Sequence, residues 1–486
     1  MSSIQVFNTL TNKKEEFVPI SGNKVNLYAC GPTVYDSSHL GHARMAIVWD
    51  VIQRYLRFKG FDVTFVRNIT DIDDKIINRA KELNIRPDQL ARHYLYEFWA
   101  DMYALNVAPP DIEPRATEYL QQMIHMAEDL VKKGSAYEAG GDVYFDVSAS
   151  KDYGKLGKKN IEDLKSGARE QVRSQNELKE VKRNPVDFAL WKGVSTDEPG
   201  ETGWASPWGF GRPGWHLECS SMIKSVLGET IDIHGGGEDL VFPHHENEKA
   251  QSEALHEKPL AKYWLHNSFV NVSEEKMSKS LGNFKTIGDL LKEYSPDTLR
   301  LFILQHHYRN PIDFSPESMN AAKQALMRIV RASLFADAEE NGGGFYPSKH
   351  YRFDEKAAEV YKSDKTLSEF HDEFVGSMDN DFNTAVAVSH LFALADKISA
   401  NKDAAERKLW AKALKDYAGV LGFTLADTRR EVDRNSTEQV LALLLQLRQD
   451  ARANKDFKTS DLIRNELAKA GISVMDTAEG PTWEKA

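Results

Sequence analysis

Residues 24–66 read KVNLYACGPTVYDSSHLGHARMAIVWDVIQRYLRFKGFDVTFV, and this stretch decides the fold. Lys24–Ala29 is a short, partly apolar run that ends at a Cys-Gly-Pro loop signal. Met45–Phe58 has apolar residues at helical spacing, and Phe61–Val66 alternates as a strand does. A strand, a loop, a helix and a second strand in this order predict a parallel sheet of the nucleotide-binding type, and therefore an α/β fold.

The bulk composition is that of a globular chain. Of its 486 residues, 41% are hydrophobic and 28% charged, and at roughly 150 residues per domain we expect about three to four domains. No apolar run approaches the length that crosses a bilayer, and Met1–Val6 lacks the features of a signal peptide, so the expected location is the cytoplasm. The net charge of −11 neither indicates nor excludes a nucleic-acid partner, because basic strips can lie on an acidic body.

Further along the chain, the patterns predict an insertion, a helical bundle and a small terminal unit. A helix at Glu118–Lys133 and a strand pair around Asp142–Val147 interrupt the first pattern, and a strand is predicted at Ile472–Met475. Other predicted helices are Ala321–Phe335, Thr384–Ile398, Glu438–Asn454 and one near Lys458–Ala470. The expected domains are 1–116 and 210–261 as two halves of a Rossmann-like domain, 117–209 as an inserted connective domain, 262–318 as a lysine-loop domain, 319–426 as an α-helical bundle, and 427–486 as a linker with a small α+β unit.

The string His39-Leu40-Gly41-His42 stands where a helix is expected to begin. Free N–H groups and the positive end of the helix dipole favour a phosphate at such a place. The two imidazoles share a helix face and could hydrogen-bond one triphosphate, and Gly41 lets a nucleotide approach the backbone. Two histidines at a helix start are by themselves more often surface or structural residues, so this string needs a second motif.

The second motif is Lys276-Met277-Ser278-Lys279-Ser280, followed by Leu281-Gly282-Asn283. Two lysines in a mobile loop can neutralise a developing pyrophosphate and move with it. The alternative interpretation of this motif is a solvated basic loop without a catalytic role.

Together the two strings resemble those of the class I aminoacyl-tRNA synthetases, although Leu40 stands where Ile is commoner. The resemblance implies adenylate chemistry by positioning and charge stabilisation, without a protein nucleophile. It also implies catalytic roles for His39 and His42 at the ATP phosphates and for Lys276 and Lys279 at the pyrophosphate. The implied ATP-binding residues are His39, Gly41, His42, Gly237, Asp239 and Lys279, with Mg²⁺ accompanying the ATP.

A candidate metal site comes from a different set of residues. His244 and Glu248 are four residues apart, so they share one face of a helix and can share a metal. With Cys30 and Cys219, the only two cysteines, they offer two thiolates, one imidazole and one carboxylate to Zn²⁺. Spacing alone does not select this set, because two distant cysteines are usually small buried hydrophobes and indicate no disulfide framework.

The strings around these residues resemble cysteinyl-tRNA synthetases, and the resemblance covers essentially the whole chain. They are YACGPTVYD at 28–36, RNITDIDDK at 67–75 and DIHGGGEDLVFPHHEN at 232–247. The resemblance implies one Zn²⁺ held by Cys30, Cys219, His244 and Glu248, and a cysteine pocket lined by Gly31, Thr33, Thr70 and Trp215. His234, His245 and Glu246 are left as neighbours of the ligands or as structural residues. The implied partners are L-cysteine, ATP and tRNA(Cys), and the implied oligomeric state is a monomer.

The proposed metal explains how cysteine would be selected. Cysteine can give its thiolate to Zn²⁺, whereas the hydroxyl of serine is a poor soft donor and alanine offers no donor. Such a bond separates near-isosteres better than pocket shape does, so no editing domain is expected, and 117–209 is short for one.

By the same resemblance, the C-terminal unit is an anticodon-binding domain. The implied contacts are Arg452, Asp461, Asp476 and Trp483, since Arg and Asp can read base edges and Trp can stack an unpaired base. Without the resemblance, ordinary surface charge and a terminal aromatic packed on the fold are the commoner interpretations.

Three rival functions remain open. One is a cysteine ligase that passes cysteine to an amino-sugar, which residues 319–486 argue against because such enzymes look like truncated relatives. Another is an additional cysteine persulfide synthesis with pyridoxal phosphate on lysines, for which Lys75, Lys276 and Lys279 are available. The third is a non-catalytic tRNA-binding relative, which the intact ATP and metal strings disfavour.

Overall fold

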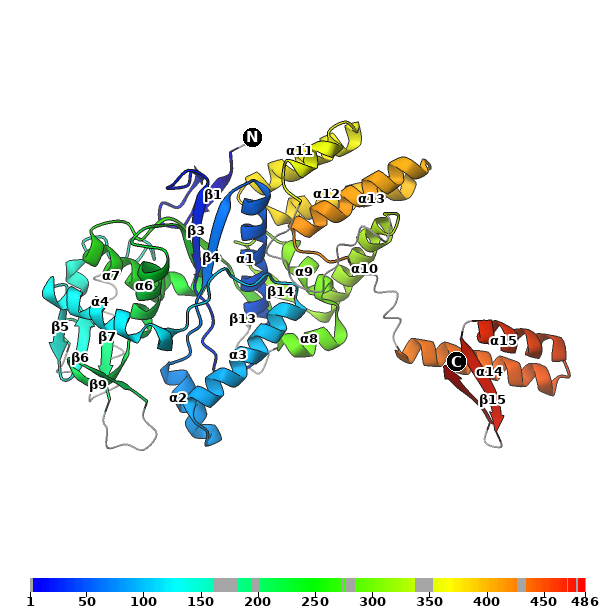
Figure 1. Cartoon of the computed structure of the whole chain (residues 1–486), viewed down its shortest axis with the longest axis horizontal. Coiled ribbons are helices and arrows are strands. Elements are labelled where there is room, and N and C mark those ends of the chain that lie inside the picture. Colours follow the sequence, from blue (N-terminus) through cyan, green and yellow to red (C-terminus); the bar gives the residue numbers. More distant parts are fainter. Residues whose placement is uncertain are drawn as a thin grey trace. The chain divides into compact units, whose positions relative to one another are not determined.

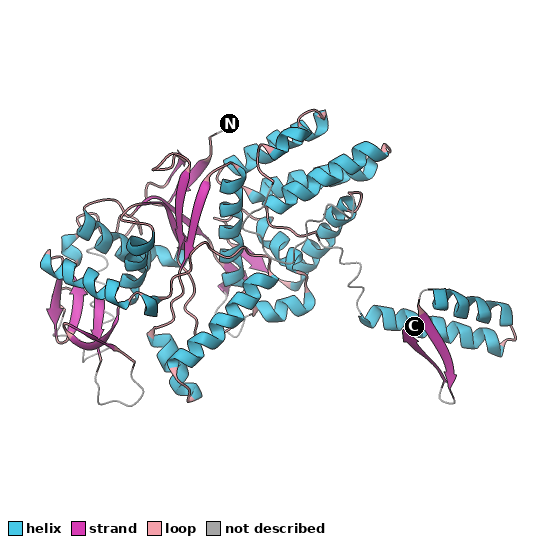
Figure 2. Ribbon diagram, in the orientation of Figure 1, coloured by secondary structure: helices cyan, strands magenta, loops and turns pink. Residues whose placement is uncertain are grey.

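The computed structural model describes residues 3–160, 182–194, 202–272, 275–276, 285–336, 353–425, 434–469, 471–477 and 480–485. The chain forms two compact units, Met1–Leu425 and Ala426–Ala486. Both units contain helices and strands, as Figure 2 shows, and the predicted mixed α/β character is confirmed.

A parallel sheet of four strands lies at the centre of the first unit, in the order β11-β10-β3-β4. The strands are β3 (Lys24–Ala29), β4 (Asp62–Arg67), β10 (Ile231–Gly237) and β11 (Ala261–Asn267). The strand predicted at Lys24–Ala29 is confirmed residue for residue, and the second predicted strand is shifted by one residue. Because β10 pairs with β3, the C-terminal ends of two strands that are distant in sequence meet at one edge of the sheet.

Helices cover both faces of this sheet, as a parallel sheet requires. Successive strand residues point to opposite faces. Leu27 therefore joins the core that α1 (Leu40–Phe58) covers, whereas Tyr28 joins a second core with Met222 of α6 (Trp215–Val226). Figure 1 shows α1 and α6 on either side of the strands.

The free edge of β4 is also covered. Helices α2 (Asp74–Leu83) and α3 (Pro87–Ala104) follow β4 and lead into an extended segment that runs along it. In this segment, the carbonyl of Ile112 accepts a hydrogen bond from the Arg67 N–H at 3.2 Å, and the Asp111 N–H donates to the Phe65 carbonyl at 2.8 Å. The pairing removes an exposed strand edge.

The insertion has a sheet and a core of its own. Helix α4 (Leu120–Lys132) packs over a five-stranded antiparallel sheet in the order β5-β6-β7-β9-β8. The strands are β5 (Ala136–Ala139), β6 (Asp142–Phe145), β7 (Phe188–Gly193), β8 (Trp204–Ser206) and β9 (Gly209–Pro213). The predicted helix and strand pair are present as α4 and β5–β6, and the other three strands were not predicted.

A small sheet leads toward the lysine-rich string. Strand β12 (Val270–Val272) pairs antiparallel with β13 (Glu275–Lys276) and parallel with β14 (Ile312–Phe314). Helices α8 (Ile287–Glu293) and α9 (Pro296–Leu304) connect the two sides. A separate hairpin near the N-terminus consists of β1 (Gln5–Asn8) and β2 (Lys13–Glu16).

Four longer helices follow and complete the first unit. They are α10 (Pro316–Ser333), α11 (Lys365–Asp379), α12 (Thr384–Ala400) and α13 (Ala404–Val420). Their apolar faces belong to the same core as α1, and this confirms the helical pattern predicted for this part of the chain. The division of the first unit into separate domains stays a prediction.

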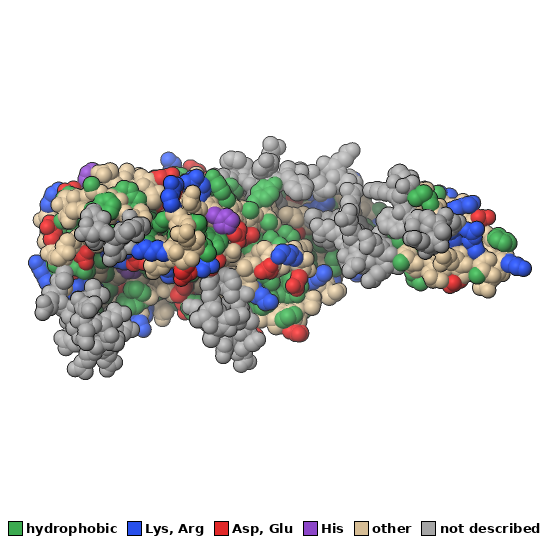
Figure 3. Space-filling view, turned by 90° about the horizontal axis from the view of Figure 1, so that it is seen from below, with side chains coloured by type: hydrophobic (Ala, Val, Ile, Leu, Met, Phe, Trp, Pro, Cys, Tyr) green, Lys and Arg blue, Asp and Glu red, His purple; other side chains and the backbone are tan. Residues whose placement is uncertain are grey.

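The second unit contains α14 (Arg434–Ala453), α15 (Phe457–Lys469) and a hairpin of β15 (Ile472–Thr477) with β16 (Gly480–Lys485). Both helices and the first strand were predicted, whereas β16 was not. None of the helices in the described ranges is long and apolar enough to cross a membrane. The face drawn in Figure 3 carries basic and acidic side chains next to each other, so the net charge of −11 does not describe the local charge.

Candidate active site and metal centre

Four buried ligand-type side chains meet behind the C-terminal end of β3. Cys30 follows β3, Cys219 lies on α6, His244 lies in a short helical turn (Val241–His245), and Glu248 lies on α7 (Glu246–His256). One ligand atom of each lies within 4.8 Å of the others. The structure therefore brings together the four residues of the predicted metal set, from four separate elements.

The distances inside this cluster are short. The Sγ atoms of Cys30 and Cys219 are 3.7 Å apart, and Cys219 Sγ lies 3.7 Å from His244 Nε2. Oε1 of Glu248 lies 2.9 Å from His244 Nε2 and 3.4 Å from Cys30 Sγ. All four side chains are at most 3% exposed. The predicted sharing of one helix face by His244 and Glu248 is confirmed.

Three further histidines extend the cluster. His234 Nε2 lies 2.8 Å from Oε2 of Glu248. His245 Nδ1 lies 2.8 Å from His266 Nε2, and His266 Nδ1 lies 2.8 Å from the hydroxyl of Thr9. Cys30, His234, His245 and Glu248 also lie close enough to form a second ligand set, which has one thiol instead of two.

The charges of the cluster depend on each other. Burial raises the pKa of the Cys30 thiol well above its usual range, with Cys219 adding to the rise. Burial also acts to raise the pKa of Cys219, but hydrogen bonds with Cys30 and His244 lower it to about 6. Burial opposes ionisation of Glu248 as well, but His244 and His234 hold its pKa well below its usual range. One thiolate and one carboxylate thus supply negative charge that a bound cation can neutralise.

The residues predicted to line a cysteine pocket surround this cluster. The indole of Trp215 stacks on the His244 ring, with centroids 4.0 Å apart. Thr33 and Thr70 pair as an isolated parallel bridge. Gly31 donates its N–H to Asn68 Oδ1 at 2.8 Å. A Cβ on Gly31 would lie 1.7 Å from the Asn68 carbonyl oxygen, so only glycine fits at this position.

Sequence reasoning missed Glu218, a buried carboxyl group beside Cys219. The hydroxyl of Thr70 donates to Oε2 of Glu218 at 3.1 Å. Burial raises the pKa of Glu218 well above its usual range, and the negative charges of Cys219 and Asp73 add to this rise. Its sequence position, in the first turn of an amphipathic helix, gives no sign of this environment.

His39 and His42 lie at the start of α1, as predicted. Nδ1 of His39 accepts hydrogen bonds from the N–H groups of Gly41 (3.0 Å) and His42 (3.4 Å), and Nδ1 of His42 accepts from the His39 N–H at 3.2 Å. The rings stack with centroids 3.8 Å apart, and both residues are half-buried. The two imidazoles therefore face one location at a helix N-terminus.

Gly237 and Asp239 lie where β10 ends. Gly237 is the last residue of the strand, and Asp239 lies exposed in the short helix Glu238–Leu240 that follows. A Cβ on Gly237 would lie 2.6 Å from Oδ1 of Asp239. The carboxylate is thus held close to the backbone at the C-terminal end of a parallel strand, where nucleotide ligands bind in α/β folds.

The lysine-rich string begins at a described strand and then leaves the described residues. The backbone of Lys276 pairs with Asn271, but the side chain of Lys276 and the whole of Lys279 lie outside the described part of the chain. The chain then returns to the start of α1. Thr286 pairs with His39 as an antiparallel bridge, and the Leu40 N–H donates to the Lys285 carbonyl at 3.2 Å. The C-terminal end of this string is thus attached to the helix start that carries the two histidines.

Arg44 makes a further link that the sequence did not reveal. It is 1% exposed, and its guanidinium donates to the carbonyls of Phe269, Tyr308 (3.0 Å) and Asn310. It therefore fixes α1, two residues after His42, to the segments that precede β12 and β14.

The predicted anticodon residues lie in the second unit. Arg452 is exposed on α14, and Asp461 is exposed on α15, where Arg464 contacts it at 3.2 Å. Asp476 and Trp483 belong to β15 and β16, and their side chains lie outside the described atoms.

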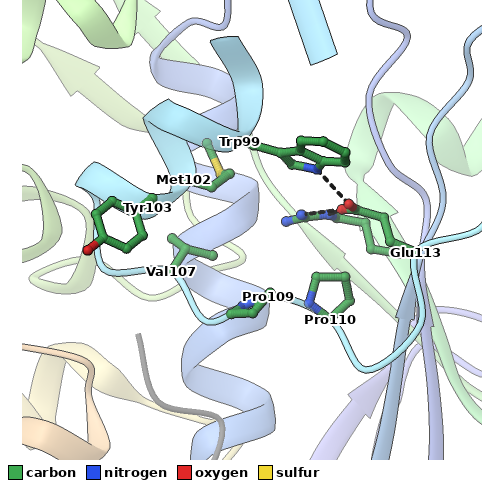
Figure 4. A pocket seen from close by; sticks show the side chains of 8 residues that line it. Trp99, Met102, Tyr103, Val107, Pro109, Pro110 and Glu113 are labelled. Atoms are coloured by element: carbon green, nitrogen blue, oxygen red, sulfur yellow. Dashed lines mark hydrogen bonds and ion pairs between the residues drawn. The ribbon is translucent and has the colours of Figure 1, made fainter. Parts of the chain in front are cut away.

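A pocket of about 310 Å³ lies elsewhere, beside α3. Glu113 accepts a hydrogen bond from the Trp99 indole N–H at 2.6 Å, as Figure 4 shows. It also accepts one from Arg67 Nη2 at 2.6 Å. The remaining lining residues are Met102, Tyr103, Val107, Pro109 and Pro110. None of the predicted site residues lines this pocket, and its charged groups are paired with each other.

Three sequence models of known domains match the chain. The model described as the class I (C) tRNA synthetase catalytic domain matches residues 16–324. The DALR domain model matches 373–426, and the model of the cysteinyl-tRNA ligase anticodon binding domain matches 437–483.

Full-length relatives and solved structures agree with these matches. Proteins named cysteine–tRNA ligase from Maridesulfovibrio salexigens (46% identical, 99% of each chain), Heliobacterium modesticaldum (45%, 100% of each) and Thermococcus gammatolerans (46%, 99% of each) are similar throughout. In fold, the chain resembles methionyl-tRNA synthetase of Mycobacterium tuberculosis bound to methionyl-adenylate, with a TM-score of 0.54 and 17% identity over 87% of this chain and 94% of that chain. It also resembles the LeuRS–tRNA–LeuAMS complex of Agrobacterium radiobacter, with a TM-score of 0.57 and 12% identity over 84% and 85%.

Proposed function

Because this chain belongs to the cysteine–tRNA ligases, a family of class I aminoacyl-tRNA synthetases, we propose that its buried cluster of Cys30, Cys219, His244 and Glu248 binds one Zn²⁺ and selects the substrate. The activity is the charging of tRNA with cysteine at the expense of ATP. The observation that supports the metal is the approach of four ligand atoms from four elements to within 4.8 Å, inside a buried site.

The donor set fits zinc. Two sulfurs, one imidazole nitrogen and one carboxylate oxygen are a usual combination for Zn²⁺, and thiolates favour it over the hard cations Mg²⁺ and Ca²⁺. The alternative set around His234 and His245 offers only one thiol, which makes it the weaker candidate. When bound, the metal would supply an electrophilic position for the thiolate of the substrate.

The protein residues then act by selecting and positioning the substrate. Among near-isosteres, only cysteine offers a soft thiolate at this position, so serine and alanine are rejected by the chemistry of the donor. Gly31, Thr33, Thr70 and Trp215 would line the pocket, in which the Trp215 indole also holds the His244 ring in place. The carboxylate of cysteine can then attack the α-phosphate of ATP without a protein nucleophile.

The ATP site is proposed at the start of α1 and the end of β10. His39, His42 and the N–H groups around Gly41 would hold the phosphates, which Mg²⁺ would accompany. Gly237 and Asp239 would contact the nucleoside, and Lys276 and Lys279 would neutralise the leaving pyrophosphate. The attachment of Thr286 to His39 supports this assignment, because it ties one end of the lysine string to the helix start.

The second unit is proposed to read the anticodon of tRNA(Cys) through Arg452, Asp461, Asp476 and Trp483. The match of residues 437–483 to an anticodon-binding domain supports this proposal, and it favours tRNA over an amino-sugar as the acceptor of cysteine. Residues 1–116 with 210–261, 117–209, 262–318, 319–426 and 427–486 remain the proposed divisions, and a monomer remains the proposed state. Cysteine persulfide synthesis stays a prediction.

The decisive experiment is ATP–pyrophosphate exchange without tRNA, with cysteine or serine as substrate, alongside a measurement of bound zinc. Wild type is expected to exchange with cysteine only and to hold about one Zn²⁺ per chain. Cys219→Ala and His244→Ala are expected to lose both properties. His390→Ala, on α12 and far outside the cluster in sequence, should retain both. Exchange that survives equally well without zinc would contradict the metal assignment, and exchange with serine would contradict the proposed selection.

A further inference from the structure

Glu218 is a buried carboxyl group that no cationic side chain of the described residues neutralises. Its side chain is 1% exposed, and the hydroxyl of Thr70 donates to its Oε2 at 3.1 Å. Within the described ranges of the chain, no Lys, Arg or His side chain forms an ion pair with it. Burying a carboxylate without a cation costs free energy, so this environment indicates that a cationic partner is missing.

The hydrogen bonds around Glu218 leave acceptor positions on Thr70 and Glu218 without a donor. The Gly31 N–H donates to Asn68 Oδ1, the Asn68 amide donates to Thr70 Oγ1 at 3.4 Å, and the Thr70 hydroxyl donates to Glu218. This chain of bonds uses the single hydroxyl donor of Thr70 and one of the two amide N–H donors of Asn68. A hydroxyl oxygen has two lone pairs and a carboxylate about four acceptor positions, so both Thr70 and Glu218 can accept more. The missing partner is a group with several donors and a positive charge.

The position of Glu218 relative to the thiol site narrows the identity of that partner. Glu218 and Cys219 are consecutive residues of α6, and Cys219 belongs to the cluster that would receive a substrate sulfur. In cysteine, only two carbon atoms separate the sulfur from the α-ammonium group. A ligand whose sulfur lies at the cluster would therefore carry its ammonium group into the neighbourhood of Glu218. The carboxyl group is as deeply buried as Cys30 and Cys219, the groups that the substrate sulfur must approach.

We propose that Glu218, together with the hydroxyl oxygen of Thr70, binds the α-ammonium group of the substrate cysteine. This inference rests on the proposed function, since the cluster defines where the sulfur lies. The site would then read two features of the amino acid at once, the thiol through the metal cluster and the amine through a buried carboxylate. A thiol acid without the amine would leave Glu218 unpaired, and a site of this kind rejects such an analogue strongly.

The test compares cysteine with its des-amino analogue, 3-mercaptopropionate, in ATP–pyrophosphate exchange. Glu218→Gln keeps the shape of the side chain and its acceptor for Thr70, but removes the charge. In this variant kcat/KM for cysteine should fall about 100-fold, whereas kcat/KM for 3-mercaptopropionate should change by less than about threefold. Bound zinc should equal that of wild type. Glu253→Gln, on α7 next to Lys249, is the matched control and should leave the ratio of the two kcat/KM values unchanged.

A second variant controls for the possibility that Glu218→Gln loses activity through misfolding. Glu218→Asp keeps the charge but shortens the side chain, so it should retain a preference for cysteine between those of wild type and Glu218→Gln. Equal losses for both substrates, or the same preference in both variants and wild type, would overturn the inference and assign Glu218 a structural role. If wild type itself does not exchange with cysteine, the failure lies with the proposed function instead.

Discussion

The imidazole of His234 lies 2.8 Å from the Oε2 atom of Glu248, and both side chains are fully buried. The other carboxylate oxygen of Glu248 contacts His244 at 2.9 Å. Both carboxylate oxygens of Glu248 are thus engaged. One contacts His244 of the proposed ligand set, and the other contacts His234 on strand β10 of the central sheet. Partners of this kind orient a ligating carboxylate and influence how tightly a metal is held.

Replacing His234 by Ala is therefore expected to weaken zinc binding about 10- to 100-fold without removing a proposed ligand. The measurement is competition with a chelator of known affinity, followed by zinc release. His390→Ala is the control, because His390 lies on α12 and forms an ion pair with Glu373 of the neighbouring helix α11, outside the cluster. Unchanged affinity in His234→Ala would mean that Glu248 needs no orientation by the sheet.

Substituting Gly31 tests the close approach of two loops in the proposed cysteine pocket. A methyl group at Gly31 would overlap the Asn68 carbonyl oxygen at 1.7 Å, so the backbone must move. Gly31→Ala is expected to lower the free energy of unfolding by about 3 kcal/mol or more. Gly376→Ala, at an exposed position of helix α11 with open space around it, should instead raise it by up to about 1 kcal/mol. Urea unfolding of both variants measures the difference, and similar effects would contradict the packing argument.

The buried histidines predict a loss of stability in acid. Burial, with the neighbouring His234 adding to it, lowers the pKa of His266 to about 3. In the unfolded chain a histidine takes up a proton near pH 6.5, so below this pH the unfolded state binds a proton that the folded state does not. His266 should thus cost about 1.4 kcal/mol of stability for each pH unit below 6.5, until its folded pKa is reached.

His266→Gln should remove this contribution. Its unfolding free energy should fall less steeply between pH 6.5 and pH 5 than that of wild type, by about 1.4 kcal/mol per unit. Both proteins are measured without metal, so that metal release in acid cannot add to the slope. If the unfolding free energies of the two proteins fall in parallel with pH, His266 takes up its proton as readily in the folded protein as in the unfolded chain, and the argument is wrong.

Removing the second compact unit should separate the two half-reactions. A chain that ends at Leu425 keeps every proposed ATP, cysteine and metal residue. Its cysteine-dependent exchange should stay within about threefold of wild type, whereas kcat/KM for tRNA should fall about 100-fold or more because a linked binding module is lost. Parallel losses in both assays would show instead that the two units depend on each other.

The local patterns of the sequence predicted the sheet well because they depend on neighbouring residues. Strand Lys24–Ala29 was recovered in full, and helix α1 was recovered from Met45 to Phe58. The start of α1 was predicted from a different signal, the string His39-Leu40-Gly41-His42, because its two histidines and its glycine do not contribute to apolar periodicity. The strands of the insertion have only three to six residues each. Most of them were not predicted, because so short a run shows little periodicity.

The residues of the site also fall into those that local spacing predicted and those that it did not. The i, i+4 pair His244 and Glu248 followed from spacing and is confirmed by their contact. Cys30 and Cys219 are separated by 189 residues, so only resemblance could join them before the fold was known. Glu218 and His266 were not found, because their surroundings arise from distant segments that no local pattern encodes. Lys279 and the Lys276 side chain lie outside the described residues, and their roles stay predictions.

Cys30 and Cys219 are the only thiols in the whole chain, and both are buried in one cluster. An enzyme that handles free cysteine meets a reactive thiol, and often its oxidised dimer, at every turnover. With no cysteine on its outer surface, this protein offers these compounds no exposed partner for mixed-disulfide formation. For the same reason, any alkylation of this chain by a thiol reagent must occur at Cys30 or Cys219, and so reports directly on the proposed metal cluster.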